Sequence, residues 1–185
     1  MVQYQEQELA RRCAKGDSRA RKELYTLYSA RLYGLCLRYC TDAEKARDLL
    51  HDSFIKVYDK IGRFQYRGEG SLYSWMARLT IGICVDEIRR RSRINFVDLD
   101  EGPDISDEPS ADIVSKIPGH KIRELIDKLP PVRRTVFNLH YIDGLSHKDI
   151  AEMLGIQEKS STSMAAKARS SLALMIKDYI DRQDE

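Results

Sequence analysis

Apolar residues recur at the helical period along most of this chain, and the pattern predicts an all-α protein. In the first half they form three stripes with intervals of three and four residues, the spacing of one helix face. The stripes are Ala20, Leu24, Leu27, Tyr28, Leu32, Leu35 and Tyr39; Ala46, Leu49, Leu50, Ser53, Phe54, Val57, Tyr58 and Ile61; and Leu72, Trp75, Met76, Leu79, Ile83 and Ile88. With a short helix from Gln5 to Ala14, they predict a bundle of four helices. Asp42 and Ser71 precede the second and third stripes as expected N-caps.

The second half predicts a helix-turn-helix within a further group of helices, at about 121–128, 131–141, 146–153 and 158–181. Ser146 and Asp149 have the spacing of a capping box at a helix start. Gly155 follows that helix, where a tight turn needs a positive φ. Two helices joined by a short glycine-containing turn place the second helix in the DNA major groove.

Charge divides the chain into three parts. Residues 1–93 carry 19 Lys and Arg against 12 Asp and Glu, a net charge of +7. Residues 94–120 have a net charge of −6, lack helical periodicity and contain Pro and Gly, so we expect a flexible acidic linker. Residues 121–185 have a net charge of +1. The three parts together suggest two domains joined by the linker. The linker acids are Asp98, Asp100, Glu101, Asp104, Asp107, Glu108 and Asp112.

Composition narrows the class of protein. The chain has 185 residues, of which 42% are hydrophobic and 32% charged, which is typical of a soluble globular protein. The sequence has no apolar run near the roughly 20 residues that span a bilayer, and its first residues are polar, so we expect a cytoplasmic protein. Four cysteines, Cys13, Cys36, Cys40 and Cys84, lack the spacing of a metal site and are expected as reduced, mostly buried thiols. We expect no metal and no cofactor.

Several short sequence segments, taken in their order along the chain and with the spacing between them, resemble a known family. They are residues 48–58, the loop 66–71 followed by Trp75, the basic run 89–91, and Leu-Pro-Pro at 129–131 ahead of the helix-turn-helix. Together they resemble the extracytoplasmic-function (ECF) sigma factors of bacterial RNA polymerase, over nearly the whole chain. The resemblance implies an initiation subunit with a first domain that binds core polymerase and the −10 promoter element, and a second that binds the −35 element.

The resemblance also implies roles for individual residues. Residues expected to bind core polymerase, on a helix face that is otherwise an ordinary solvated surface, are Asp48, His51, Asp52 and Lys56. Residues expected to bind −10 DNA, by base capture or phosphate contact, are Phe64, Tyr66, Arg67, Gly68, Glu69, Gly70, Ser71, Arg78, Arg89, Arg90 and Arg91, with Arg93 as a further phosphate contact. Residues expected to bind −35 DNA are Lys159, Ser160, Ser161, Thr162, Ser163, Ala166, Lys167 and Arg169.

The sequence departs from the family at two places. Many members carry a base-reading Asn where this chain has Gly82, which offers no side chain for that contact. Members also usually carry Lys and Arg early in the recognition helix, where this chain has the run 160–163 of Ser and Thr. These hydroxyls can bond to phosphates or bases, or the run is a capped helix start without base contact. Trp75 is assigned to the core stripe.

Other functions remain open at this point. A stand-alone helix-turn-helix repressor or activator accounts for the second domain but not for the 66–71 loop, and it usually needs a dimer, for which no heptad seam is present. An enzyme is not expected, because His51, His120, His140 and His147 are scattered without a nucleophile. The expected partners are bacterial core RNA polymerase, promoter DNA and an anti-sigma factor, and the free protein is expected to be a monomer. The linker is either a solubilising tether or an electrostatic mimic of nucleic acid inside the polymerase.

Overall fold

A computed structural model describes residues 2–40, 42–91, 114 and 117–183, and within these ranges the chain is helical with no β-strand. The contacts divide the chain into two compact units, Met1–Arg91 and Ser92–Glu185. The all-α prediction is confirmed. None of the described helices combines the length and apolarity that crossing a bilayer requires.

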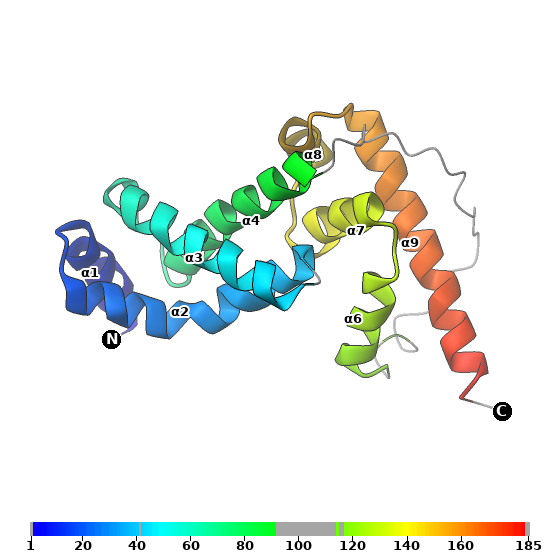
Figure 1. Ribbon diagram of the computed structural model, residues 1–185, viewed down its shortest axis with the longest axis horizontal. Helices are drawn as coiled ribbons and strands as arrows, with labels where there is room; N and C mark the ends of the chain where they lie inside the picture. Colours follow the sequence, from blue (N-terminus) through cyan, green and yellow to red (C-terminus); the bar gives the residue numbers. More distant parts are fainter. Residues whose placement is uncertain (1, 41, 92–113, 115–116, 184–185) are drawn as a thin grey trace. The chain divides into compact units, whose positions relative to one another are not determined.

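The first unit is a bundle of helices α1 (Val2–Ala14), α2 (Ser18–Tyr39), α3 (Ala43–Lys60) and α4 (Ser71–Arg91). A short 3₁₀ turn, η1 (Ile61–Arg63), follows α3. Helix α2 packs against both α3 and α4, and α1 packs against α2, η1 and the start of α4 (Figure 1). The loop between η1 and α4 is therefore held between α1 and the rest of the bundle.

Local capping sets the starts of α2 and α3. The Asp17 carboxylate accepts the Arg19 amide at 2.8 Å, and the Asp42 carboxylate accepts the Glu44 amide at 2.9 Å. The prediction for Asp42 is thus confirmed. The prediction for Ser71 is wrong, because Ser71 is itself the first residue of α4 and its hydroxyl accepts the Arg67 amide at 3.2 Å.

The buried faces of α2 and α4 differ in part from the predicted stripes. Leu27 is 56% exposed, so it does not belong to the core face of α2. In α4 the buried face turns toward Ile81, Cys84 and Val85, because this helix packs against α2 and α3 at once. The stripe members Trp75, Leu79, Ile83 and Ile88 are only half-buried. The four cysteines all lie within the described residues and form no disulfide; Cys13, Cys36 and Cys84 are buried, and Cys40 is half-buried.

Gly82 lies inside α4 with room for a side chain. A Cβ built there meets no atom within 4 Å. We expect Gly82→Ala to raise the free energy of unfolding by about 1 kcal/mol, because glycine is a poor former of helix interiors. Denaturant unfolding measures the change. Gly155→Ala is the opposing control: Gly155 has a φ of +68°, so alanine there is expected to cost about 1 kcal/mol. A loss of stability in Gly82→Ala would contradict this account of α4.

The second unit comprises α6 (Gly119–Asp127), α7 (Pro131–Phe137), a short π-helical turn η2 (Asn138–Ile142), α8 (His147–Leu154) and α9 (Glu158–Asp181). Helices α6, α7 and α8 all pack against the long α9 (Figure 1). One buried cluster joins α6, α7 and α9, with members Leu125, Leu129, Phe137, Ala168, Leu172 and Ile176. Ile117 also packs in this cluster, although its position falls in the stretch predicted as linker. The linker acids and Arg93 lie outside the described residues.

Candidate nucleic-acid interface

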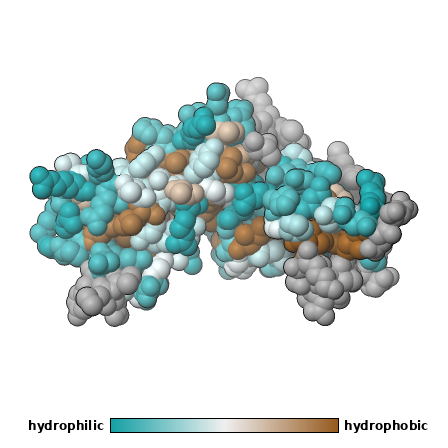
Figure 2. Space-filling model, turned by 90° about the horizontal axis from the view of Figure 1, so that it is seen from below, coloured by the Kyte–Doolittle hydropathy of each residue, from teal (hydrophilic) through white to brown (hydrophobic). Residues whose placement is uncertain are grey.

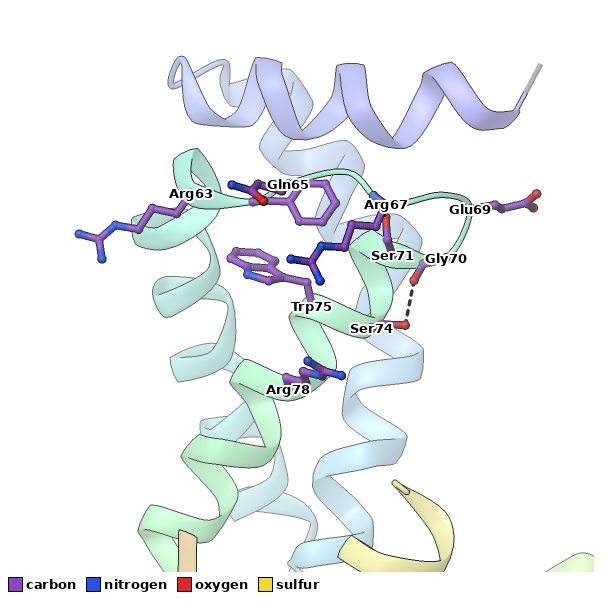
Figure 3. Close-up of a pocket in the computed structure, with 10 residues that line it drawn as sticks. Arg63, Gln65, Arg67, Glu69, Gly70, Ser71, Ser74, Trp75 and Arg78 are labelled. Atoms are coloured by element: carbon purple, nitrogen blue, oxygen red, sulfur yellow. Dashed lines mark hydrogen bonds between the residues drawn. The ribbon is translucent and has the colours of Figure 1, made fainter. Parts of the chain in front are cut away.

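A cavity of about 460 Å³ opens at the N-terminal end of α4. It is formed by the loop that leaves η1 and by the first two turns of α4 (Figure 3). Its lining residues are Arg63, Phe64, Gln65, Arg67, Glu69, Gly70, Ser71, Ser74, Trp75 and Arg78. A cavity with aromatic rings and several guanidinium groups suits a flat, anionic ligand such as a nucleotide.

Two aromatic rings and the arginines define the chemistry of the cavity. The ring centroids of Phe64 and Trp75 lie 5.5 Å apart at an interplanar angle of 54°, and both side chains are half-buried. The Arg67 side chain extends toward the Trp75 indole, whereas Glu69 extends away from the cavity (Figure 3). The indole face is thus available for stacking beside a positive charge, which favours an unstacked base with its phosphate.

Glycine gives the loop its shape. Gly68 has a φ of +119° and Gly70 a φ of +78°, which side-chain-bearing residues rarely adopt. The Ser71 amide donates to the Gly68 carbonyl at 3.1 Å, and the Ser74 hydroxyl donates to the Gly70 carbonyl at 3.0 Å. These bonds turn the backbone sharply into α4 and set the rim of the cavity.

Six of the residues predicted to bind −10 DNA line this cavity: Phe64, Arg67, Glu69, Gly70, Ser71 and Arg78. Tyr66 and Gly68 do not. The Tyr66 hydroxyl is buried and has no hydrogen-bond partner among the described residues. Burial, with the nearby carboxylates of Glu6 and Glu69, raises the pKa of Tyr66. Tyr66 therefore supports the loop from within and does not offer its ring to a ligand in this cavity.

Four lining residues were not predicted to belong to the site: Arg63, Gln65, Ser74 and Trp75. Trp75 was assigned to the core, but it lines the cavity because α4 turns its buried face away at this point. The spacing of Ser71, Ser74 or Trp75, and Arg78 follows one face of a helix and could have revealed them. Arg63 and Gln65 gave no such signal, since the backbone of η1 and the loop brings them in.

The basic end of α4 lies well apart from the cavity. Arg89 is eleven residues beyond Arg78, which is about 16 Å along an α-helix. The exposed Arg89 lies 3.9 Å from the exposed Asp86, and the exposed Arg90 pairs with the half-buried Glu87. Arg91 is the last residue of α4. Arg89 and Arg90 therefore belong to a separate surface from the base-sized cavity, and ion pairs on an exposed surface contribute little to stability.

The helix-turn-helix has the predicted local geometry. The Ser146 hydroxyl accepts the Asp149 amide at 3.1 Å and donates to the Asp149 carboxylate at 2.7 Å. Gly155 ends α8 in the left-handed conformation with a φ of +68°. Helices α8 and α9 are thus joined by the tight turn that the sequence predicts.

The outer face of α9 carries most residues predicted to bind −35 DNA. Exposed residues at intervals of three and four are Lys159, Thr162, Ser163, Ala166 and Arg169, whereas Ser160 and Lys167 are half-buried. Ser161 is fully buried, and its hydroxyl lies 3.0 Å from the Nδ1 atom of His147. Ser161 is therefore not part of the outer face of α9, because its hydroxyl links α9 to α8.

A pair of histidines stands at the entry to the helix-turn-helix. The rings of His140 and His147 are stacked with centroids 4.0 Å apart. The Nδ1 atom of His140 donates to the Leu145 carbonyl at 3.0 Å, and His147 bonds to Ser161. Burial, and then the proximity of His140, lower the pKa of His147, against an opposing effect of Glu158.

Acidification is expected to weaken the helix-turn-helix. Because the pKa of His147 is lowered in the folded chain, the unfolded chain takes up its proton first, near the ordinary value of about 6.5. The stabilisation is thus complete above that pH and is lost as the pH falls toward the folded pKa. Protection factors of α8 amides in hydrogen exchange should fall between about pH 7.5 and 5.5.

Two variants test the source of this pH dependence. His147→Gln should flatten it, whereas His120→Gln, at an exposed histidine on α6, should leave it unchanged. Equal pH dependence in His147→Gln and the unmodified chain would contradict the assignment to His147.

One face of α3 carries the residues predicted to bind core polymerase. Asp48, His51 and Asp52 are exposed and Lys56 is half-buried. Ile55 lies among them with 55% of its surface exposed, which makes it one of the largest exposed apolar side chains among the described residues. We call Asp48, His51, Asp52, Ile55 and Lys56 the α3 face. Hydrophilic residues dominate the view in Figure 2, and apolar side chains gather in a few patches, one of them an elongated band. An apolar centre with a charged rim is typical of protein interfaces.

Known proteins resemble the chain over nearly all its length. A family model described as "Sigma-70 region 2" matches residues 24–94, and one described as "Sigma-70, region 4" matches residues 119–172. The ECF RNA polymerase sigma factor SigW of Bacillus subtilis is 29% identical over 175 residues, covering 89% of this chain and 92% of SigW. The RNA polymerase sigma-H factor of Pseudomonas aeruginosa is 27% identical over 183 residues, covering 93% of this chain and 94% of that factor.

A solved structure shares the fold. It is the sigma factor RpoE of Bartonella quintana, in a co-crystal with the anti-sigma factor NepR. The TM-score is 0.52 at 19% identity, over 84% of this chain and 96% of that one. The two matched regions and the helix-turn-helix define a sigma-70 type initiation factor of bacterial transcription. Within that class, the chain belongs to the ECF sigma factors.

Proposed function

We propose that this sigma factor docks on core RNA polymerase through the α3 face, captures an unstacked −10 base in the α4 cavity, and contacts the −35 element through the outer face of α9. The cavity is the observation that supports this proposal most directly. It joins a stacking surface to lining arginines from η1, the loop and α4, inside the region 2 match. Extruded bases are held in proteins by such stacking and polar contacts.

Each of the three surfaces suits a different binding partner or DNA element. Residues Lys159 and Arg169 on α9 suit phosphates, and Thr162, Ser163 and Ala166 suit base edges or thymine methyl groups. Arg89 and Arg90 suit phosphates of the −10 duplex. The polymerase supplies the second anchor, so the chain works as a monomer in the holoenzyme and in the cytoplasm, where the polymerase acts. We further propose that an anti-sigma protein sequesters it, as NepR is bound to the Bartonella sigma factor.

Footprinting with and without core polymerase tests this proposal against a stand-alone repressor. Promoter fragments are first selected from random DNA with the holoenzyme. The chain alone is expected to leave them unprotected, and the holoenzyme is expected to protect both promoter elements. Protection of a specific site by the chain alone, unchanged when core polymerase is added, would favour the repressor.

A further inference from the structure

Glu6 on α1 is bonded to the segment that forms one side of the α4 cavity. Its carboxylate accepts the Gly70 amide at 3.3 Å through Oε1 and the Leu72 amide at 3.4 Å through Oε2. The Tyr28 hydroxyl, on α2, donates to Oε1 at 3.2 Å. One side chain thus ties together three parts of the first unit that are far apart in the sequence.

The start of α4 needs an acceptor that its own sequence does not supply. The first amides of a helix have no partner within the helix, and Asp17, Asp42 and Ser146 satisfy them locally at the starts of α2, α3 and α8. At α4 the preceding residue is Gly70, which has no side chain. Glu6 takes the place of the missing cap, and its negative charge is favourable at a helix N-terminus.

Glu6 acts from outside the cavity. It is half-buried and does not line the cavity, whereas Gly70 and Ser71 do. Helix α1 crosses over the loop on the side away from Arg78 (Figure 3). Burial, with the neighbouring Glu6 carboxylate, raises the pKa of Tyr28 to about 12, so its hydroxyl stays protonated and keeps donating to Glu6.

We propose that Glu6 is a positioning residue for promoter opening, because its carboxylate fixes Gly70 and the first turn of α4 and so preforms the wall of the base-capture cavity. The inference rests on the proposed function of that cavity. A wall that is ordered before the base arrives loses less conformational entropy on binding. Glu6 therefore affects the opening step, in which the base enters, and not the docking of duplex DNA that precedes it.

The test compares Glu6→Ala and Glu6→Gln with Glu8→Ala, all in the full chain. Glu8 is the matched control, since it is an exposed glutamate of the same helix whose carboxylate accepts from the Arg11 side chain and not, among the described residues, from the start of α4. Amide-resolved hydrogen exchange is followed at Gly70 and Leu72. Holoenzyme affinity for a closed duplex promoter and the rate of opening are measured separately, on a promoter selected with the unmodified holoenzyme.

We expect Glu6→Ala to speed exchange at both amides by roughly fivefold and to slow opening by a similar factor, as for loss of a cap. Closed-complex affinity should stay unchanged, Glu6→Gln should be intermediate, and Glu8→Ala should match the unmodified chain. If Glu6→Ala disrupts the bundle, Glu6→Gln provides the test, because glutamine keeps the size of the side chain and one neutral acceptor oxygen.

Unchanged opening in the Glu6 variants would overturn the inference. Trp75→Ala, run in parallel, separates two kinds of failure. If Trp75→Ala slows opening and the Glu6 variants do not, only the role of Glu6 is wrong. If neither slows opening, the cavity does not capture a base and the proposed function fails with it.

Discussion

Replacing Trp75 by alanine is expected to slow promoter opening by roughly 5- to 150-fold, because stacking on an aromatic side chain contributes about 1–3 kcal/mol per base. The indole is half-buried in a cavity with Phe64 and Arg67, so its removal takes away the main stacking surface without cutting into the core. Opening is measured by permanganate reactivity of thymines in the −10 region of a selected promoter.

Conservative variants separate stacking from stability. Trp75→Phe keeps an aromatic ring and should recover most of the opening rate. Affinity for closed duplex DNA should be the same in the unmodified protein, Trp75→Ala and Trp75→Phe. Trp75 is the single tryptophan of the chain. Its fluorescence should therefore also change when an excess of a single-stranded −10 oligonucleotide is added to the chain without core polymerase. A folded Trp75→Ala protein that opens promoters at the normal rate would contradict the base-capture role.

The second large effect is expected on the α3 face. Ile55→Asp should lower affinity for core polymerase by at least about thirtyfold, because an apolar side chain at the centre of an interface contributes about 2 kcal/mol or more when it is a hot spot. A carboxylate there must also be desolvated without a partner. Titration of labelled core polymerase measures the dissociation constant.

Leu27→Asp is the matched control for this effect. Leu27 is 56% exposed and Ile55 is 55% exposed, and both lie on helices of the same unit, so the two variants make similar changes in solubility. Only Ile55 is surrounded by the acidic and basic residues of the α3 face. Equal losses of affinity in both variants would show that docking is not specific to this face.

Local chemistry in the sequence predicts much of this fold. Asp42 caps α3, Ser146 and Asp149 start α8, and Gly155 ends it in the left-handed conformation, because each of these features depends on residues within a few positions. The order and type of the helices follow from apolar spacing for the same reason. The caps, the turn and the order of the helices can therefore be predicted without knowing the tertiary contacts.

Tertiary packing determines what the sequence could not show. Trp75 lies on an apolar stripe, but α4 packs against α1, α2 and α3, and this packing leaves the Trp75 side chain at the wall of a cavity. Ser161 lies in a polar run, yet it faces His147 across the helix-turn-helix. Glu6 caps α4 from 64 residues away, and no local pattern marks such a partner. The sequence therefore predicted the cavity through Phe64, the loop and Arg78, but it did not predict that Trp75 lines the cavity or that Glu6 supports it.

If this chain is the initiation subunit of RNA polymerase, one reconstitution should show it directly. Purified core polymerase is incubated with genomic DNA fragments and nucleotides, with and without the chain, and the 5′ ends of the transcripts are sequenced. We predict that the chain creates a new set of defined start sites, preceded by two shared sequence elements. Folded protein that neither binds core polymerase at low salt nor changes its start sites, in the absence of any inhibitor, would contradict the account.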